Sequence, residues 1–229
     1  MVFPDPANYE FPWYVRIGDY NFPSFNIVAF GVPLTAENVL EAHGKGIFPW
    51  YVENVPLPWH CPEERALLDL ERITVPRSLA KVRRKAEFTF TIDAAFEQVI
   101  RECSLAPRPG QHGTWITDDF IRVYTELHKA GPAHSVEAWD RSGRLVGGLY
   151  GVESRGYFSG ESMFHKRSNA SKLALLHLID HLSERGARWL DIQVMTPHMK
   201  ALGAIDVPRQ DFLTLIEEAD ARRLRLFGE

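Results

Sequence analysis

The chain has 229 residues, of which 45% are hydrophobic and 24% are charged, and its formal net charge is −4. This apolar content supports one substantial core or two modest ones, and the composition excludes an intrinsically disordered protein. A net negative charge argues against a protein that coats nucleic acid over its whole surface, although a local basic patch is compatible with it.

Targeting and redox signals are weak along the whole sequence. It contains no run of about 18 apolar residues, so it predicts no membrane span. Its first residues have neither the basic nor the apolar stretch that is typical of a secretory signal. Cys61 and Cys103 lie far apart, which makes a disulfide framework unexpected and favours a reducing cytoplasm.

Residues 1–65 are rich in proline and aromatic side chains, which disfavours long regular elements. One helix is predicted in this stretch, with Thr35 as its N-cap and its end at Gly44 or Gly46. We therefore expect residues 1–65 to form a small, irregular N-terminal lobe.

After this lobe the pattern becomes regular. A strand followed by a short basic helix is predicted across residues 71–85, and residues 88–93 alternate as a half-buried strand does. Residues 94–103 continue as a helix. A second helix is predicted between its cap, Thr117, and Gly131.

Three more strands are predicted in quick succession, and the turn residues between them favour antiparallel hairpins. A strongly apolar helix follows, then one more strand and two helices. The strands are expected at residues 134–139, 144–153, 157–165 and 188–194, and the helices at residues 168–186, 197–204 and 209–223. This order is typical of an α+β domain, which we expect to span residues 66–229.

Two polar patterns in the predicted strands could carry chemistry. Glu161 lies between Phe158 and Phe164, so it could stand at the edge of a pocket and attract a cation. Asp191 and Gln193 share one face of the last strand because side chains alternate, and this polar pair suggests a pocket wall. A solvent-exposed strand face is the alternative interpretation of both patterns.

The start of the long apolar helix is a candidate anion site. Ser168 or Asn169 is the expected N-cap, and the free N–H groups there lie near Lys166, Arg167 and Lys172. An ordinary capped helix start with solvated cations is the alternative.

The short basic helix is a second candidate anion site, because it gathers five cations within nine residues of an acidic chain. These cations are Arg77, Lys81, Arg83, Arg84 and Lys85. Three tryptophans, Trp50, Trp59 and Trp115, could stack on bases or fill an acyl pocket. The alternatives are a solvated helix face for the cations and core packing for the tryptophans.

Several other signals lack a required part. His177 and His181 have the spacing of a metal pair, but the segment lacks the glutamate of HExxH, so we expect no metal site. The segment around Ser162 mimics a serine-hydrolase elbow, but Phe164 replaces its closing glycine. The sequence has neither GxxxxGK[ST] nor GxGxxG, which disfavours phosphate hydrolysis and dinucleotide binding.

Taken together, the motifs resemble the leucyl/phenylalanyl-tRNA–protein transferase family. The match runs from about residue 34 to residue 215 in the family's order and spacing. Its segments are GIFPW, GTWIT, AHSVEAW, LVGGLYGV, FSGESMFH, NASKLALL, LDIQVMTPHMKALGA and VPRQDFL. The resemblance implies a small N-terminal lobe and a domain similar to the GCN5-related N-acetyltransferases, with a mixed, largely antiparallel sheet flanked by helices.

The resemblance also implies an activity. The family transfers Leu or Phe, and less readily Met, from aminoacyl-tRNA to the N-terminal α-amine of proteins that begin with Arg or Lys. This marks those proteins for degradation through the N-end rule pathway. The implied partners are the 3′ end and acceptor stem of aminoacyl-tRNA and the acceptor protein. No metal ion, cofactor or membrane is implied, and the expected location is the cytoplasm.

Carried over position by position, the resemblance assigns roles to individual residues. The implied catalytic group is Glu161, Asp191 and Gln193. Trp50 and Trp115 would hold the 3′-terminal adenosine. The aminoacyl side chain would be enclosed by Leu149, Phe158, Leu175, Leu178 and Leu190. The tRNA would contact Lys81, Arg83, Arg84, Lys85, Asn169 and Ser171.

The implied reaction is chemically reasonable for these residues. The donor ester is already activated, and an α-amine with a pKa near 8 is partly neutral at pH 7. Catalysis can therefore be mainly positioning, which contributes up to roughly 7–11 kcal/mol. Gln193 would hydrogen-bond the attacking amine with Asp191 orienting it, and Glu161 would bind the amine or the basic side chain of the acceptor.

Two segments depart from the family pattern. The usual Gly-Gly-Asp-Leu-Ser reads GVPLT, and the usual Trp-Trp-Ser-Pro-Asp-Pro-Arg reads WHCPEER at residues 59–65. The sequence therefore leaves open the transfer of another amino acid or transfer to acidic N-termini. It also leaves open a non-catalytic tRNA- or peptide-binding module. An acetyl-CoA-dependent acyltransferase is a further alternative, but the glycine-containing loop of that class is absent from HKRSNAS.

Overall fold

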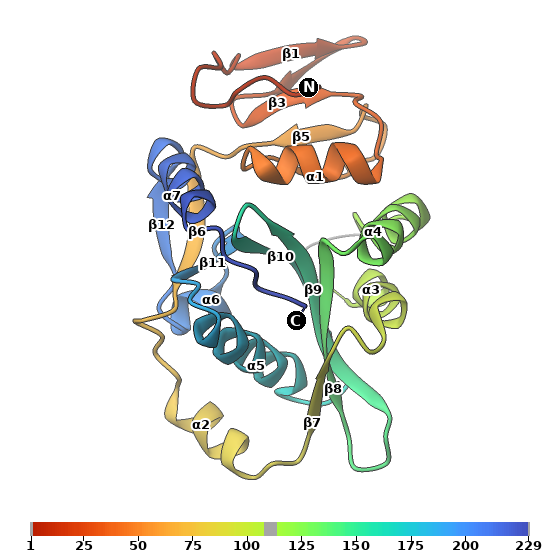
Figure 1. The fold of residues 1–229 in the computed structure, drawn as a ribbon. Helices are drawn as coiled ribbons and strands as arrows, with labels where there is room; N and C mark the ends of the chain where they lie inside the picture. The colour runs from red at the N-terminus through yellow and green to blue at the C-terminus, as the bar shows by residue number, and fades with distance from the viewer. Residues whose placement is uncertain (1, 108–113, 229) are drawn as a thin grey trace.

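The computed structural model describes residues 2–107 and 114–228, and its centre is a seven-stranded sheet (Figure 1). The strands are β6 (Glu64–Asp69), β7 (Thr89–Ile92), β8 (Ala133–Trp139), β9 (Leu145–Ser154), β10 (Tyr157–His165), β11 (Trp189–Gln193) and β12 (Ile205–Pro208). Their order is β12-β6-β11-β10-β9-β8-β7. β10 and β11 run parallel, and the other neighbours run antiparallel. The expected α+β class with a mixed, largely antiparallel sheet is confirmed.

Helices cover both faces of this sheet (Figure 1). They are α2 (Arg77–Arg84), α3 (Phe96–Leu105), α4 (Asp118–Ala130), α5 (Ala170–Glu184), α6 (Pro197–Ala201) and α7 (Arg209–Ala221). The alternation along β9 explains the two cores, because Leu149 packs with the leucines of α5 while Tyr150 packs with α3 and α4. The predicted hairpins of β8, β9 and β10 are confirmed, and they place α5 on the opposite face from α3 and α4.

The long helix α5 starts directly against β9. A Cβ atom built on Gly147 would lie 2.6 Å from the Cβ of Ala170 at the start of α5. Only a residue without a side chain allows this close approach. The glycine therefore fixes the first turn of α5 beside the central strands.

The residues before β6 form one helix and two small sheets. The elements are β1 (Tyr14–Ile17), β2 (Tyr20–Pro23), β3 (Ile27–Phe30), α1 (Ala36–Gly44), β4 (Phe48–Pro49) and β5 (Pro58–His60). The side chain of the predicted cap Thr35 accepts a hydrogen bond from the Asn38 amide at 3.2 Å, so α1 begins where the sequence predicts. Val39 and Ala42 are fully buried in the cluster that contains Tyr124 of α4. Helix α1 therefore packs on the larger sheet and brings its last turn to it.

The strand expected at the start of residues 71–85 is wrong, although the basic helix after it is confirmed as α2. The strand is β6, which ends at Asp69 before this segment. Because β6 lies between β11 and β12, its residues Ala66, Leu67 and Leu68 are all buried and show no alternation. The short strands β1 to β5 and β12 were not expected, since each has only two to four residues.

Within residues 2–107 and 114–228, none of the helices combines the length and apolarity that crossing a membrane requires.

Candidate active site

A buried polar cluster forms where β6, β10 and β11 lie side by side. Its centre is Asp191, which the register of the parallel pair places opposite Ser159. Arg65 donates to Asp191 from Nε to Oδ1 at 2.8 Å and from the terminal guanidinium nitrogen to Oδ2 at 2.7 Å. The Ser159 hydroxyl donates to Oδ2 at 2.7 Å, and the backbone N–H of Gln193 donates to Oδ1 at 2.9 Å. Both carboxylate oxygens of Asp191 are therefore fully engaged by the protein.

The guanidinium of Arg65 is enclosed on both faces. It lies 4.6 Å from the ring centroids of Phe48 and of Phe212, and it also donates to the Gly46 carbonyl at 3.1 Å. Burial lowers the pKa of Arg65, but the Asp191 carboxylate, together with smaller effects of Tyr157 and Cys61, raises it, and the net result is a pKa above its usual value. The site thus contains an ion pair whose side chains are at most 1% exposed.

A β-bulge separates Asp191 from Gln193, and Gln193 adopts a left-handed backbone with φ of 62°. Such a backbone is unfavourable for a side-chain-bearing residue, and the hydrogen bond from the Gln193 amide to Asp191 holds it. The Gln193 side-chain nitrogen donates to Glu161 Oε1 at 3.2 Å and to the Ser159 hydroxyl at 3.4 Å. The alternative of an exposed strand face is wrong for Asp191 and Gln193, which are both buried.

Glu161 is also buried, with a side chain that is only 1% exposed. His43 Nε2 lies 3.0 Å from its Oε1 atom. The Tyr124 hydroxyl is a further neighbour: burial raises the pKa of Tyr124 well above its usual value, and the charge of Glu161 adds to this. The solvent-facing alternative for Glu161 is therefore wrong as well.

Glu161 borders a cavity of about 260 Å³ between β10, β11, α5 and α6. The apolar part of its wall includes four of the five side chains named for the aminoacyl pocket, Leu149, Leu175, Leu178 and Leu190. Phe158, the fifth, is not in this wall, because its ring is buried against Phe227 at a centroid distance of 5.2 Å. The polar residues that line the cavity include Glu161, Ser162, Thr196 and His198.

A second cavity of about 410 Å³ lies at the start of α5 and shares Met163 and His198 with the first. Its wall includes Ser168, Asn169, Ser171 and Lys172. Asn169 occupies the N-cap position with φ of 66°, and its side chain makes no capping hydrogen bond. Two expected cations are engaged elsewhere: Lys166 pairs with Glu102, and Arg167 pairs with Glu87 at 3.5 Å.

The tryptophans differ in how deeply they are buried. Trp59 is a core residue, since it is fully buried and donates from Nε1 to the Val32 carbonyl at 3.1 Å. Trp115 is buried in the same core cluster, and its ring centroid lies 5.5 Å from that of the partly buried Trp50. Neither is part of the wall of the 260 Å³ cavity. Gly113, which begins the GTWIT motif before Trp115, lies outside the described residues.

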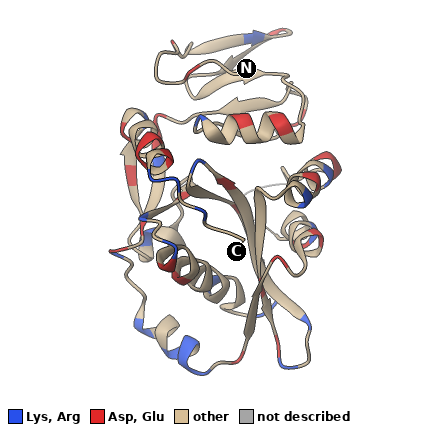
Figure 2. Ribbon diagram, viewed as in Figure 1, with Lys and Arg blue, Asp and Glu red and all other residues tan. Residues whose placement is uncertain are grey.

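The basic helix α2 carries its cations on an exposed surface (Figure 2). Arg83 pairs with Asp180, and Lys85 lies 3.8 Å from Glu87. Lys81 and Arg84 have no ion-pair partner within the described ranges. These two cations are therefore the ones most available to an anionic partner.

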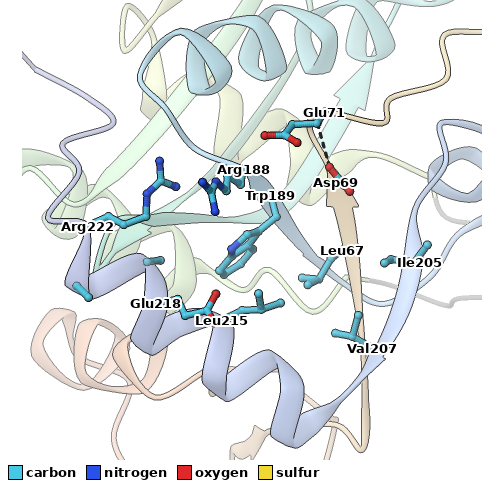
Figure 3. Close-up of a pocket in the computed structure, with 12 residues that line it drawn as sticks. Leu67, Asp69, Glu71, Arg188, Trp189, Ile205, Val207, Leu215, Glu218 and Arg222 are labelled. Atoms are coloured by element: carbon cyan, nitrogen blue, oxygen red, sulfur yellow. Dashed lines mark hydrogen bonds between the residues drawn. The ribbon is translucent and has the colours of Figure 1, made fainter.

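The structure also contains a hollow that sequence reasoning did not indicate (Figure 3). It measures about 800 Å³, and Leu67, Trp189 and Leu215 contribute to its wall beneath α7. None of Glu161, Gln193 or the pocket leucines borders it. The candidate active site is therefore the smaller cavity next to the polar cluster.

No group of three or more His, Cys, Asp or Glu residues in the described part of the chain is arranged to hold a metal ion. The helical histidine pair is engaged in packing and hydrogen bonding. His177 stacks on Phe90 at 5.2 Å, and His181 Nε2 lies 2.8 Å from the Leu226 carbonyl oxygen.

Besides Ser159, which lies two positions before Glu161 on β10, sequence reasoning missed three residues of the cluster: His43, Arg65 and Tyr124. Each lies on a different element and is distant in sequence from Glu161 and Asp191. Their local patterns look like ordinary parts of an amphipathic helix or a buried strand. A charged Arg65 followed by three buried apolar residues on β6 was the one available signal, because a charged residue in a buried strand needs a partner.

Family models and individual relatives both match this chain to the same protein family. Residues 67–217 match the family model described as leucyl/phenylalanyl-tRNA protein transferase, and residues 33–63 match the model of its N-terminal domain. A leucyl/phenylalanyl-tRNA–protein transferase of Nitratidesulfovibrio vulgaris (strain DP4) is 45% identical over 200 residues, covering 87% of this chain and 85% of that protein. The protein of the same name from Pseudoalteromonas atlantica is 44% identical over 193 residues, covering 84% and 82%.

Solved structures show weaker similarity. L-PGS from Bacillus licheniformis aligns with a TM-score of 0.45 and 13% identity, over 70% of this chain and 66% of that one. FemX aligns with a TM-score of 0.47 and 12% identity, over 68% and 64%. In both cases the alignment spans less than two thirds of the other chain.

Proposed function

Because the chain belongs to the leucyl/phenylalanyl-tRNA–protein transferase family, we propose that it moves Leu or Phe, and less readily Met, from aminoacyl-tRNA to protein N-termini. The proposed acceptors begin with Arg or Lys, and the product is a new peptide bond that marks the protein for N-end rule degradation. The proposed partners are therefore aminoacyl-tRNA and a protein with a basic N-terminal residue. The reaction takes place in the cytoplasm, a location that the reduced, buried Cys61 and Cys103 support.

One observation carries this proposal: an apolar cavity of about 260 Å³ has a buried carboxylate on its rim. Leu149, Leu175, Leu178 and Leu190 suit an apolar aminoacyl side chain. Glu161 suits a cationic group, either the acceptor α-amine or its basic side chain. A cavity of this kind discriminates mainly by shape and by rejecting polar side chains, because one methylene contributes only about 1–3 kcal/mol.

In the proposed mechanism, Gln193 positions the attacking amine. Its side-chain nitrogen faces Glu161 Oε1, so its carbonyl oxygen points away from that carboxylate and can accept a hydrogen bond from the amine. The amine nitrogen then bonds to the ester carbonyl carbon, and the 3′ oxygen of the tRNA leaves and takes up the proton that the amine releases.

Asp191 supports this step indirectly. Its two oxygens already accept hydrogen bonds from Arg65, Ser159 and the Gln193 amide, so it orients Gln193 and is not available as the base. Positioning is enough for much of the rate, since good orientation contributes up to roughly 7–11 kcal/mol.

The remaining assignments concern the tRNA. We propose that Trp50 and Trp115 hold the 3′-terminal adenosine: Trp50 is partly exposed and could stack on a base, and the buried Trp115 packs against it with ring centroids 5.5 Å apart. Asn169 and Ser171 would contact the 3′ end from the cavity at the start of α5. Lys81, Arg83, Arg84 and Lys85 of α2 would lie along the acceptor stem.

We also propose a two-part organisation, with residues 1–65 as a small N-terminal lobe and residues 66–229 as a domain similar to the GCN5-related N-acetyltransferases. The separate small sheets before β6 support a distinct lobe. The cluster that joins Val39 of α1 to Tyr124 of α4 means that this lobe shares a core with the larger domain.

The direct test is transfer of radiolabelled Leu, Phe, Met and Arg from charged tRNA to peptides beginning with Arg, Lys, Asp or Glu. Transfer of Leu or Phe to the Arg and Lys peptides is the expected result. Transfer of Arg, or transfer to acidic N-termini, would keep the reaction and overturn the specificity. Tight tRNA binding without any product would overturn the proposed enzymatic function in favour of a non-catalytic binding module.

A double substitution on α2 tests the acceptor-stem contact. Lys81→Ala with Arg84→Ala is expected to weaken tRNA binding and to reduce the slope of log affinity against log salt by about 1–2 units, because each lost phosphate contact removes roughly 0.7–0.9. Filter binding at several salt concentrations measures this slope. Arg122→Ala with Lys129→Ala is the control. It removes the same charge from two exposed positions of α4 and is expected to leave the slope unchanged. Equal slopes for the α2 variant and the wild type would remove α2 from the tRNA site.

A further inference from the structure

One member of the polar cluster comes from outside the large sheet. His43 lies in the last turn of α1, and its Nε2 is 3.0 Å from Glu161 Oε1. Their side chains are 0% and 1% exposed. Within the described residues, neither ring nitrogen of His43 makes an aligned hydrogen bond, so this close polar contact is the interaction that its ring makes with a charged group.

A buried imidazole needs a reason to be there, because an apolar side chain would fill the same space without desolvating polar atoms. Two hydrogen bonds fix the backbone of His43. Its carbonyl oxygen accepts from the Tyr157 hydroxyl at 2.5 Å and from the backbone N–H of Gly46 at 3.0 Å. The ring is therefore presented to Glu161 by a fixed backbone.

The electrostatics of the cluster also single out His43. Arg65 and Asp191 neutralise each other through a bidentate pair, so that cation is not available to Glu161. The other polar neighbours of Glu161 are the amide of Gln193 and the phenol of Tyr124, which carry no positive charge. His43 is thus the neighbour that brings an imidazole nitrogen, which can donate a hydrogen bond, to 3.0 Å from the carboxylate.

Both His43 and Gln193 act on the same oxygen of Glu161. Each approaches Oε1, at 3.0 and 3.2 Å respectively. Oε2 is buried and makes no hydrogen bond of ordinary geometry with a described residue, and the Tyr124 hydroxyl is a further polar neighbour of the carboxylate. Glu161 itself borders the apolar cavity. Fixing Oε1 therefore holds the Glu161 carboxylate in one orientation at the wall of this cavity.

We propose that His43 is a positioning residue for aminoacyl transfer, which fixes Oε1 of Glu161 so that the carboxylate is held in place to accept a hydrogen bond from the neutral α-amine of the acceptor. This inference rests on the proposed function, because the acceptor amine is the group that Glu161 would bind. It gives α1, and with it the N-terminal segment, a part in acceptor recognition that acts through Glu161. Contacts of this kind are commonly loose without substrate and tighten in the complex.

The test compares two replacements of His43 with the full chain. His43→Leu removes Nε2 and is expected to lower kcat/KM for an Arg-initiated peptide at least tenfold, with an unchanged KM for Leu-tRNA. His43→Gln keeps a side-chain N–H donor and is expected to recover at least a third of the lost activity. Thermal unfolding of both variants identifies any general loss of structure.

A double substitution separates action through Glu161 from a purely structural role. In the Glu161→Gln background, His43→Leu is expected to reduce kcat/KM by less than a further twofold, because the carboxylate that it positions is already gone. A full tenfold effect in that background would overturn the inference. Wild-type kinetics for His43→Leu, or an equal rise in KM for Leu-tRNA, would overturn it as well.

The same experiment distinguishes failure of the inference from failure of the proposed function. If the unsubstituted chain transfers Leu to the peptide while His43→Leu keeps its kinetics, only the role of His43 is overturned. If the unsubstituted chain transfers nothing from any charged tRNA, the proposed function fails and the inference falls with it.

Discussion

Replacing Asp191 with alanine is expected to lower the free energy of unfolding by about 3–5 kcal/mol, because the guanidinium of Arg65 would stay buried without its counter-charge. The two side chains are 1% and 0% exposed, so water cannot substitute for the lost carboxylate. A loss of this size is a large fraction of the roughly 5–15 kcal/mol that stabilises an ordinary domain. Urea unfolding followed by circular dichroism measures it.

Two further variants give this experiment its controls. Asp69→Ala removes a carboxylate from the same strand as Arg65, but its side chain is 35% exposed, and we expect a loss below about 1 kcal/mol. Arg65→Met with Asp191→Leu removes both charges and is expected to recover most of the stability without recovering activity. Activity stays lost because Asp191 also accepts hydrogen bonds from the Gln193 backbone N–H and the Ser159 hydroxyl, which leucine cannot accept. A stability loss for Asp191→Ala no larger than that for Asp69→Ala would contradict this account of the cluster.

Glu161→Gln is expected to reduce kcat/KM for aminoacyl transfer at least tenfold while the fold is kept. The substitution preserves shape and removes the negative charge that would bind the acceptor amine, and a tenfold loss corresponds to about 1.4 kcal/mol of transition-state stabilisation. Gln193→Ala is expected to have an effect of at least the same size. It removes the side-chain amide that is hydrogen-bonded to Glu161 and that would position the attacking amine. Initial rates with Leu-tRNA and an Arg-initiated peptide give these values.

Glu184→Gln provides the matched control for charge, since Glu184 is exposed near the end of α5. We expect its kinetics to equal those of the wild type. Circular dichroism and thermal unfolding of the Glu161 and Gln193 variants establish that the fold is kept. Wild-type rates in either variant would show that the chemistry takes place elsewhere in the molecule.

The sequence by itself determined much of the secondary structure and part of the site. Capping residues predicted α1 and α4, a run of apolar positions predicted α5, and turn residues predicted the hairpins of β8 to β10, because caps and turns are set by the local sequence. The family motifs named Glu161, Asp191, Gln193 and four leucines that the structure brings to one cavity or its neighbouring cluster. Their functional roles stay predictions until the variants are measured.

Only the tertiary structure decided how these residues are connected. His43, Arg65, Glu161 and Asp191 meet because α1, β6, β10 and β11 converge, and contacts between residues up to 126 positions apart leave no local pattern. Strand β6 was not predicted because it is buried on both faces and shows no alternation. The bulge at Gln193 interrupts the alternation that the sequence predicts for β11. Phe158 packs against Phe227 and does not line the cavity. Local periodicity reports which face of an element is buried, whereas the identity of the partner on that face depends on the packing of the whole chain.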